Sequence, residues 1–218
     1  ICFLRDTAEN IDAVVDEGGA AGLVCYTPVG EESVFDRLLP AGFGLIGQRE
    51  GDFGQRLLGA VEDILACGFG AVCLIDSDSP TVPTEALRRA VRELERPGDR
   101  VVLGGSEDGG YYLIGLKRAH AGVFEGISWS TASVFAETVR RAGAAGLEVV
   151  ELPLWYDVDD AATLTLLEEE LLLDRRPAFA TTDGYDAEHT RQFLAERMRA
   201  MEVNAGPAGA AAARERGR

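Results

Sequence analysis

Two carboxylates stand one residue apart directly after a short apolar run in this sequence. The run GAVCLI ends at Ile75, and Asp76 and Asp78 follow it in the stretch IDSDSP. A continuous apolar run is typical of a strand buried on both faces of a parallel sheet. Ligands bind beyond the carboxyl ends of such strands, and Mg²⁺ prefers carboxylate and phosphate oxygens. The stretch therefore indicates a metal site, and the alternative interpretation is a capped turn that leads into a helix.

A second acid-rich segment, SEDGGYY, lies between two apolar runs and contains Asp108, Gly109, Gly110 and Tyr111. Paired glycines allow a backbone to approach a ligand closely or to adopt positive φ. The acids and glycines together favour a sugar or ribose site, in which Asp108 is the best candidate to orient or deprotonate an acceptor hydroxyl. The alternative is a plain hairpin turn, because Asp-Gly is a frequent turn sequence.

A third acid-rich segment, LPLWYDVDD, follows an expected strand at residues 147–152 and contains Asp157, Asp159 and Asp160. A carboxylate from this segment could complete the metal coordination that the Asp-x-Asp pair begins. The alternative is a helix N-terminus, where the helix dipole favours acidic side chains.

Two loops add candidate ligand-binding residues. QREGDFGQRL is a glycine-rich turn that opens a helix, a place where a phosphate or a base can bind. GISWST is a loop entering a helix, where an exposed Trp129 would suit a lid or an acceptor platform, although packing is the commoner role of tryptophan. With the paired glycines, the candidate substrate-binding residues are Gln48, Gly51, Asp52, Gly54, Arg56, Gly109, Gly110, Tyr111, Trp129, Ser130 and Thr131.

The composition excludes several classes of partner. The 218 residues are 46% hydrophobic and carry a formal net charge of −16. A protein that binds nucleic acids or anionic membranes needs a basic face, which this charge disfavours. A nucleotide ligand remains compatible with the negative charge, because a bound divalent cation reverses the local field. The four cysteines form no close metal-type pair. With no signal peptide and no apolar run of membrane length, we expect a cytoplasmic protein with reduced cysteines.

Helical and strand patterns alternate along the chain and predict an α/β fold with a mostly parallel sheet. We expect one main domain at residues 1–174, a helical extension at 175–203 and a low-complexity tail at 204–218. The strands of the main domain are expected at 21–28, 42–46, 70–75, 100–104, 111–116 and 147–152.

Five segments in this order resemble a known family: QREGDFGQRL, LIDSDSPTVP, VVLGGSEDGGYYLIGL, FEGISWST and LPLWYDVDD. The chain resembles, from Phe3 to Leu172, bacterial glycosyltransferase-like proteins of the nucleotide-diphospho-sugar transferase type, some of them linked to arsenosugar biosynthesis and radical-SAM gene clusters. It is also similar to nucleotidyltransferases such as 2-phospholactate guanylyltransferase. The resemblance implies a Rossmann-like GT-A fold with three α/β/α layers.

The resemblance also implies roles for the acidic residues. Asp78 takes the position of the strand-end metal ligand, whereas Asp76 stands where the family usually carries glycine. Asp159, and next Asp157, would supply the second ligand to Mg²⁺ or Mn²⁺. The partners implied are a nucleotide sugar or a nucleoside triphosphate, together with a small-molecule acceptor. The sequence indicates no oligomeric state.

The start of the chain departs from the family pattern. Family members open with a strand and a basic glycine loop that holds the diphosphate, and neither occurs here; Lys117 lies elsewhere. We expect that the sequence is truncated at its N-terminus, and that a sheet without this strand exposes apolar edges.

The expected activity is metal-dependent transfer from a nucleotide-activated sugar. One rival is nucleotidyl transfer, in which a phosphorylated acceptor attacks a nucleoside triphosphate and pyrophosphate leaves. The other is a non-catalytic nucleotide-binding module, which the absent basic loop favours.

Overall fold

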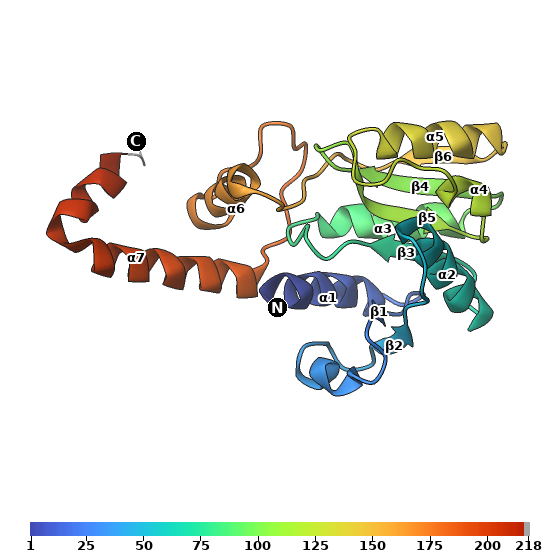
Figure 1. Ribbon diagram of the computed structural model, residues 1–218, viewed down its shortest axis with the longest axis horizontal. Coiled ribbons are helices and arrows are strands. Elements are labelled where there is room, and N and C mark those ends of the chain that lie inside the picture. Colours follow the sequence, from blue (N-terminus) through green and yellow to red (C-terminus); the bar gives the residue numbers. More distant parts are fainter. Residues whose placement is uncertain (216–218) are drawn as a thin grey trace.

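The computed structural model describes the backbone of residues 1–215 and the side chains up to residue 201 (Figure 1). Its strands are β1 (Leu23–Tyr26), β2 (Gly44–Gly47), β3 (Val72–Ile75), β4 (Arg100–Gly105), β5 (Tyr111–Leu116) and β6 (Glu148–Glu151). Its helices are α1 (Cys2–Val15), α2 (Phe53–Ala66), α3 (Thr84–Glu95), α4 (Ala121–Phe124), α5 (Val134–Ala144), α6 (Ala161–Leu173) and α7 (Glu188–Glu215), with the 3₁₀ helix η1 (Glu32–Arg37). No described helix is both long and apolar enough to cross a bilayer.

The strands form two small sheets. β1 and β2 make a parallel pair, and the larger sheet has the order β3-β5-β4-β6. In the larger sheet β5 is antiparallel to β3 and to β4, while β4 and β6 are parallel. The α/β class is confirmed, but the expected mostly parallel sheet is not. The sequence pattern missed this because a strand buried on both faces reads as a continuous apolar run in either direction.

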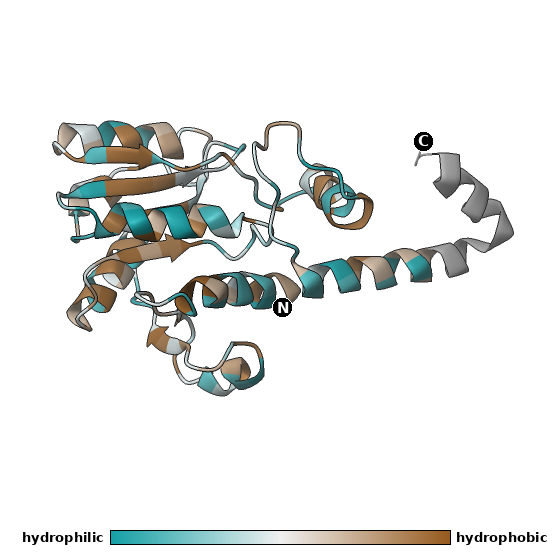
Figure 2. Ribbon diagram, turned by 180° about the vertical axis from the view of Figure 1, so that it is seen from behind, coloured by the Kyte–Doolittle hydropathy of each residue, from teal (hydrophilic) through white to brown (hydrophobic). Residues whose placement is uncertain are grey.

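Helices cover both faces of the larger sheet, so that three layers form (Figure 1). Alternate residues of β4 point to opposite faces: Val102 packs with residues of α3 and α6, whereas Val101 and Leu103 pack with residues of α2, α4 and α5. Figure 2 shows the strands as apolar and α3 as mostly polar on its outer side. The core of this frame is largely apolar, and polar chemistry is therefore left to the loops at the strand ends.

A cavity of about 1420 Å³ separates the two sheets. β1 and β3 both line it, and within the described strands β1 pairs only with β2 and β3 pairs only with β5. Apolar side chains of α1 and α2, such as Ile11 and Ile64, line the same space. The cavity therefore has largely apolar walls, and its aspartates lie at the strand ends.

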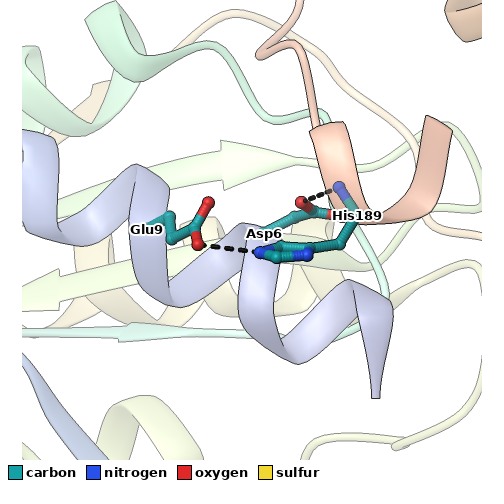
Figure 3. Close-up of side chains that lie close together, drawn as sticks. All are labelled: Asp6, Glu9 and His189. Carbon is teal, nitrogen blue, oxygen red and sulfur yellow. Dashed lines mark hydrogen bonds and ion pairs between the residues drawn. The ribbon is translucent and has the colours of Figure 1, made fainter. Parts of the chain in front are cut away.

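The C-terminal helix α7 is held on α1 by a buried carboxylate (Figure 3). Asp6 of α1 is fully buried; its Oδ1 accepts the backbone N–H of His189 at 3.0 Å, and its Oδ2 accepts the backbone N–H of Thr190 at 2.8 Å. The first backbone N–H groups of a helix have no partner within the helix. Asp6 therefore caps α7 from another helix. The side chains of the predicted tail, 204–218, lie outside the described residues.

Replacing this capping carboxylate should destabilise the protein. We expect Asp6→Ala to lower the free energy of unfolding by about 2 kcal/mol, because the buried N–H groups of α7 lose their acceptor. The control is Glu9→Gln, on the exposed side of the same contact, where Glu9 meets the His189 ring at 2.8 Å. That variant should cost less than about 0.5 kcal/mol in urea unfolding. Equal losses in the two variants would contradict the capping role.

A second, partly buried carboxylate joins α6 to the loop after β6 and to the segment before α3. Glu170 Oε2 accepts hydrogen bonds from the hydroxyls of Thr81 and Tyr156. Burial raises the pKa of Glu170 above its ordinary value of 4.5, and these two hydrogen bonds oppose the rise. The folded protein therefore holds this proton more tightly than the unfolded chain does.

This raised pKa predicts a pH-dependent contribution to stability. The protonated Glu170 contributes fully to stability at pH values below its pKa in the unfolded chain. This contribution is lost as the pH rises through its pKa in the folded protein. Glu170→Gln keeps an acceptor for both hydroxyls and carries no charge. We expect the free energy of unfolding of Glu170→Gln to rise relative to that of the wild type as pH increases above the ordinary glutamate pKa of 4.5. The control Glu169→Gln alters a side chain that is 43% exposed, and should show no such trend.

Candidate functional site

Three acid-bearing loops meet at one edge of the larger sheet. β3, β4 and β6 run in the same direction, because β5 is antiparallel to both β3 and β4. Their carboxyl ends therefore share one edge. Backbone hydrogen bonds tie the loops together: Val158 donates to the Asp78 carbonyl at 3.0 Å, and Glu107 donates to the Trp155 carbonyl at 3.0 Å. The three acid-bearing segments therefore lie at the same edge although the sheet is mixed.

Asp76 is the most strongly perturbed of these acids. Its Oδ2 accepts a hydrogen bond from Ser79 Oγ at 2.8 Å, while its Oδ1 is buried and has no partner among the described residues. Burial, and next the charge of Asp78, raise the pKa of Asp76 well above its ordinary value. A carboxylate oxygen that is buried without a donor is costly, so this position suits a ligand that brings positive charge.

The neighbouring acids repel one another. Burial and the charge of Asp159 raise the pKa of Asp78. Burial, and next the charge of Asp108, raise the pKa of Asp157 to about 6. Like charges at close range disfavour the ionised forms, and a cation would reverse this. The electrostatics thus favour a divalent cation at this edge.

The carboxylates at the sheet edge do not form a ready-made cage. Among the described residues, one set of three ligand atoms lies within 4.8 Å of one another, and it belongs to Asp6, Glu9 and His189. Both oxygens of Asp6 are already occupied by donors of α7, which accounts for that set as a structural contact. Within the described part of the chain the strand-end acids form no such set, so a cation held by them would need further ligands such as water or substrate phosphates.

Asp159 and Asp160 have different local surroundings. Asp160 is the N-cap of α6, where its Oδ1 accepts the backbone N–H groups of Ala162 and Thr163. Asp159 is exposed and lines the cavity. The helix-start interpretation thus applies to Asp160, and Asp159 remains free to act as a ligand.

The Asp108 segment forms a tight turn beside these acids. Asp108 Oδ1 accepts the backbone N–H of Gly110 at 2.7 Å, and Asp108 is an exposed residue. Gly109 has φ 91°, and a Cβ there would lie 2.2 Å from the Ala132 carbonyl oxygen. Glycine is therefore required at 109 so that the turn can touch the loop that carries Trp129.

The glycine-rich segment divides into lining and packing residues. Gln48 and Arg56 line the cavity and share a hydrogen bond of 3.3 Å. Asp52 instead caps α2 in a reciprocal arrangement with Gln55. A Cβ on Gly54 would lie 2.7 Å from the Phe124 carbonyl oxygen, so this glycine permits close packing.

The predicted site residues fall into two groups. Those that line the common cavity are Gln48, Arg56, Asp76, Asp78, Asp108, Gly110, Tyr111, Trp129, Ser130, Thr131, Asp157 and Asp159. Those that do not line it are Gly51, Asp52, Gly54 and Gly109. The sequence prediction missed Phe53, which lines the cavity and is 47% exposed. No local sequence signal singles it out, because its aromatic partner Trp129 lies far along the chain.

Comparisons with known proteins identify a structural neighbour and a family. The chain is similar to a crystal structure from Desulfovibrio desulfuricans G20, provisionally named a nucleotide-diphospho-sugar transferase, with 28% identity and a TM-score of 0.69. The match covers 89% of this chain and 84% of that one. No curated protein matches the sequence.

A family model matches residues 10–131, which is more than half of the chain. That region includes Asp76, Asp78, Asp108 and Trp129 of the cavity, whereas Asp157 and Asp159 lie beyond it. The chain therefore belongs to the family DUF2064, described as proteins conserved in bacteria and uncharacterized.

Proposed function

We propose that this protein is a metal-dependent transferase that acts on a nucleotide-activated sugar. The observation that carries the proposal is the gathering of five aspartates on one cavity: Asp76, Asp78, Asp108, Asp157 and Asp159. The pKa values of Asp76, Asp78 and Asp157 are raised by burial and mutual repulsion. Such a group is stabilised by a divalent cation and by the phosphates that accompany it.

Asp78 and Asp159 would hold Mg²⁺ or Mn²⁺, with Asp76 and Asp157 beside them. The bound cation would supply Lewis-acid stabilisation of charge on the departing nucleoside diphosphate. Asp108 would take the proton of the acceptor hydroxyl as the acceptor oxygen bonds to the anomeric carbon and the bond from that carbon to the diphosphate breaks. Arg56 would donate hydrogen bonds to the donor phosphates.

The structural neighbour supports this assignment, since its name describes a nucleotide-diphospho-sugar transferase and the match covers most of both chains. The position of Arg56 supports it further. Its Nε is buried without a partner, and its guanidinium forms no ion pair within the described side chains. A guanidinium left free on a cavity lined by carboxylates is suited to a phosphate.

Calorimetry with nucleotide sugars and nucleoside triphosphates, each with and without Mn²⁺, tests the proposal. We expect binding that requires Mn²⁺, and release of nucleoside diphosphate when an acceptor is supplied. Release of pyrophosphate from a triphosphate would instead assign nucleotidyl transfer. Metal-dependent binding without any turnover would assign a binding module.

A further inference from the structure

Three aromatic side chains form a continuous wall along the cavity, called here the aromatic wall: Phe53, Tyr111 and Trp129. The rings of Phe53 and Trp129 meet edge to face with centroids 5.0 Å apart, and those of Tyr111 and Trp129 meet edge to face at 6.4 Å. The residues come from the start of α2, from β5 and from the loop before α5. All three line the same cavity as the five aspartates.

The backbone holds Trp129 firmly in this wall. A Cβ on Gly54 would lie 3.0 Å from Trp129 Nε1, so the indole rests directly on the first turn of α2. The next residue, Ser130, has φ 60°, a left-handed conformation that is costly for a residue other than glycine. Phe135 then donates its backbone N–H to the Gly109 carbonyl at 2.8 Å, which fixes the loop against the Asp108 turn.

The wall has groups that remain unsatisfied in the protein alone. Phe53 is 47% exposed although it faces a cavity, and Tyr111 Oη is buried without a hydrogen-bond partner among the described residues. Arg56 lies over the Phe53 ring at 5.6 Å from its centroid and supports that side chain from one side. Exposed aromatic area on a cavity suits a ligand that has an apolar face.

We propose that the aromatic wall binds the acceptor, and that the acceptor carries a saturated ring with an apolar C–H face, as a pyranoside does. This inference rests on the proposed function, because it places the acceptor hydroxyl next to Asp108. The Trp129 loop and the Asp108 turn touch at Gly109 and Ala132, so a ring against Trp129 lies on the side of the proposed base. An open-chain alcohol has no such face and gains little from the wall.

Tryptophan fluorescence reports on this wall directly. The chain has two tryptophans, and Trp155 is fully buried among other core residues. A change on ligand addition therefore arises from Trp129. We expect methyl β-D-glucopyranoside to change the emission with saturation, and glycerol at the same concentration to leave it unchanged. Trp129→Phe should remove the signal while circular dichroism stays that of the wild type.

Variants of Phe53 supply the matched pair. Phe53→Ala should weaken the affinity for the pyranoside about tenfold, whereas Phe53→Tyr should keep it within about twofold, because only the former loses the edge-to-face partner of Trp129. Equal affinity in the alanine variant would overturn the proposal. So would a signal that nucleosides produce and pyranosides do not, since the wall would then hold a base.

The outcome is separable from that of the proposed function. The fluorescence titration needs neither donor nor metal. If the protein binds the pyranoside but no nucleotide with Mn²⁺, the transferase proposal is wrong and the proposed ring site stands. If it binds nucleotide with Mn²⁺ but no pyranoside, the ring site is wrong and the transferase proposal stands.

Discussion

Asp78→Ala should abolish metal-dependent nucleotide binding while the protein stays folded. Asp78 lies in the loop after β3, lines the cavity and has a pKa raised by burial and by the charge of Asp159. Loss of a metal ligand removes the cation that joins protein and phosphates, so we expect affinity for nucleotide with Mn²⁺ to fall more than about 100-fold. Calorimetry of the variant with and without Mn²⁺ measures this.

The thermal stability of Asp78→Ala distinguishes lost metal coordination from lost folding. A raised pKa means that the ionised Asp78 is disfavoured in the folded protein. Its contact with the Val158 backbone uses the main-chain carbonyl, which the alanine keeps. The metal-free variant should therefore unfold at a temperature equal to or above that of the wild type. A marked fall in this temperature would mean that lost folding, not lost coordination, explains the lost binding.

Glu107→Ala is the control for charge. Glu107 is an exposed acid at the same edge that does not line the cavity. The Glu107→Ala variant removes one negative charge without removing a proposed ligand. Its nucleotide affinity should therefore stay within about threefold of the wild-type value. Equal losses in the Glu107 and Asp78 variants would show that overall charge governs binding, and the metal assignment would be wrong.

Much of the site was predictable because it depends on strand ends. The apolar run before Asp76 and the run before the Asp157 segment each identify a strand, and acids directly after them lie at the sheet edge. Pairing direction was not predictable, because β5 has the same apolar pattern as its neighbours and is antiparallel to both. The site survives this error, since an antiparallel strand between β3 and β4 leaves their carboxyl ends together.

Other features needed the tertiary structure. Asp52 was predicted to bind substrate, yet it caps α2, and Asp160 caps α6, which is the helix-start alternative kept open for its segment. Phe53 is prominent only because Trp129, far along the chain, meets its ring. Such contacts join segments that sequence periodicity treats separately, so no local pattern reveals them.

Asp108→Asn should slow turnover strongly and leave donor binding nearly unchanged. The amide keeps an oxygen that can accept the Gly110 N–H, so the turn is preserved. An amide does not take a proton from the acceptor, and loss of a general base costs about 10² to 10⁴ in rate. We expect kcat for nucleoside diphosphate release to fall by about that factor, while Kd for the nucleotide with Mn²⁺ changes less than about threefold.

The comparison of binding with rate decides which role Asp108 has. Asp108 contributes to the raised pKa of Asp157, so its carboxylate lies within electrostatic reach of the proposed ligands. If Asp108 bound the metal, the Asn variant would lose nucleotide affinity as the Asp78 variant does. If it only shaped the turn, Asn would preserve kcat and Ala would lower it. If Asp108 accepts the proton, both Asp108→Asn and Asp108→Ala should lower kcat while the Kd for nucleotide is retained. Neither of the other two roles predicts this combination.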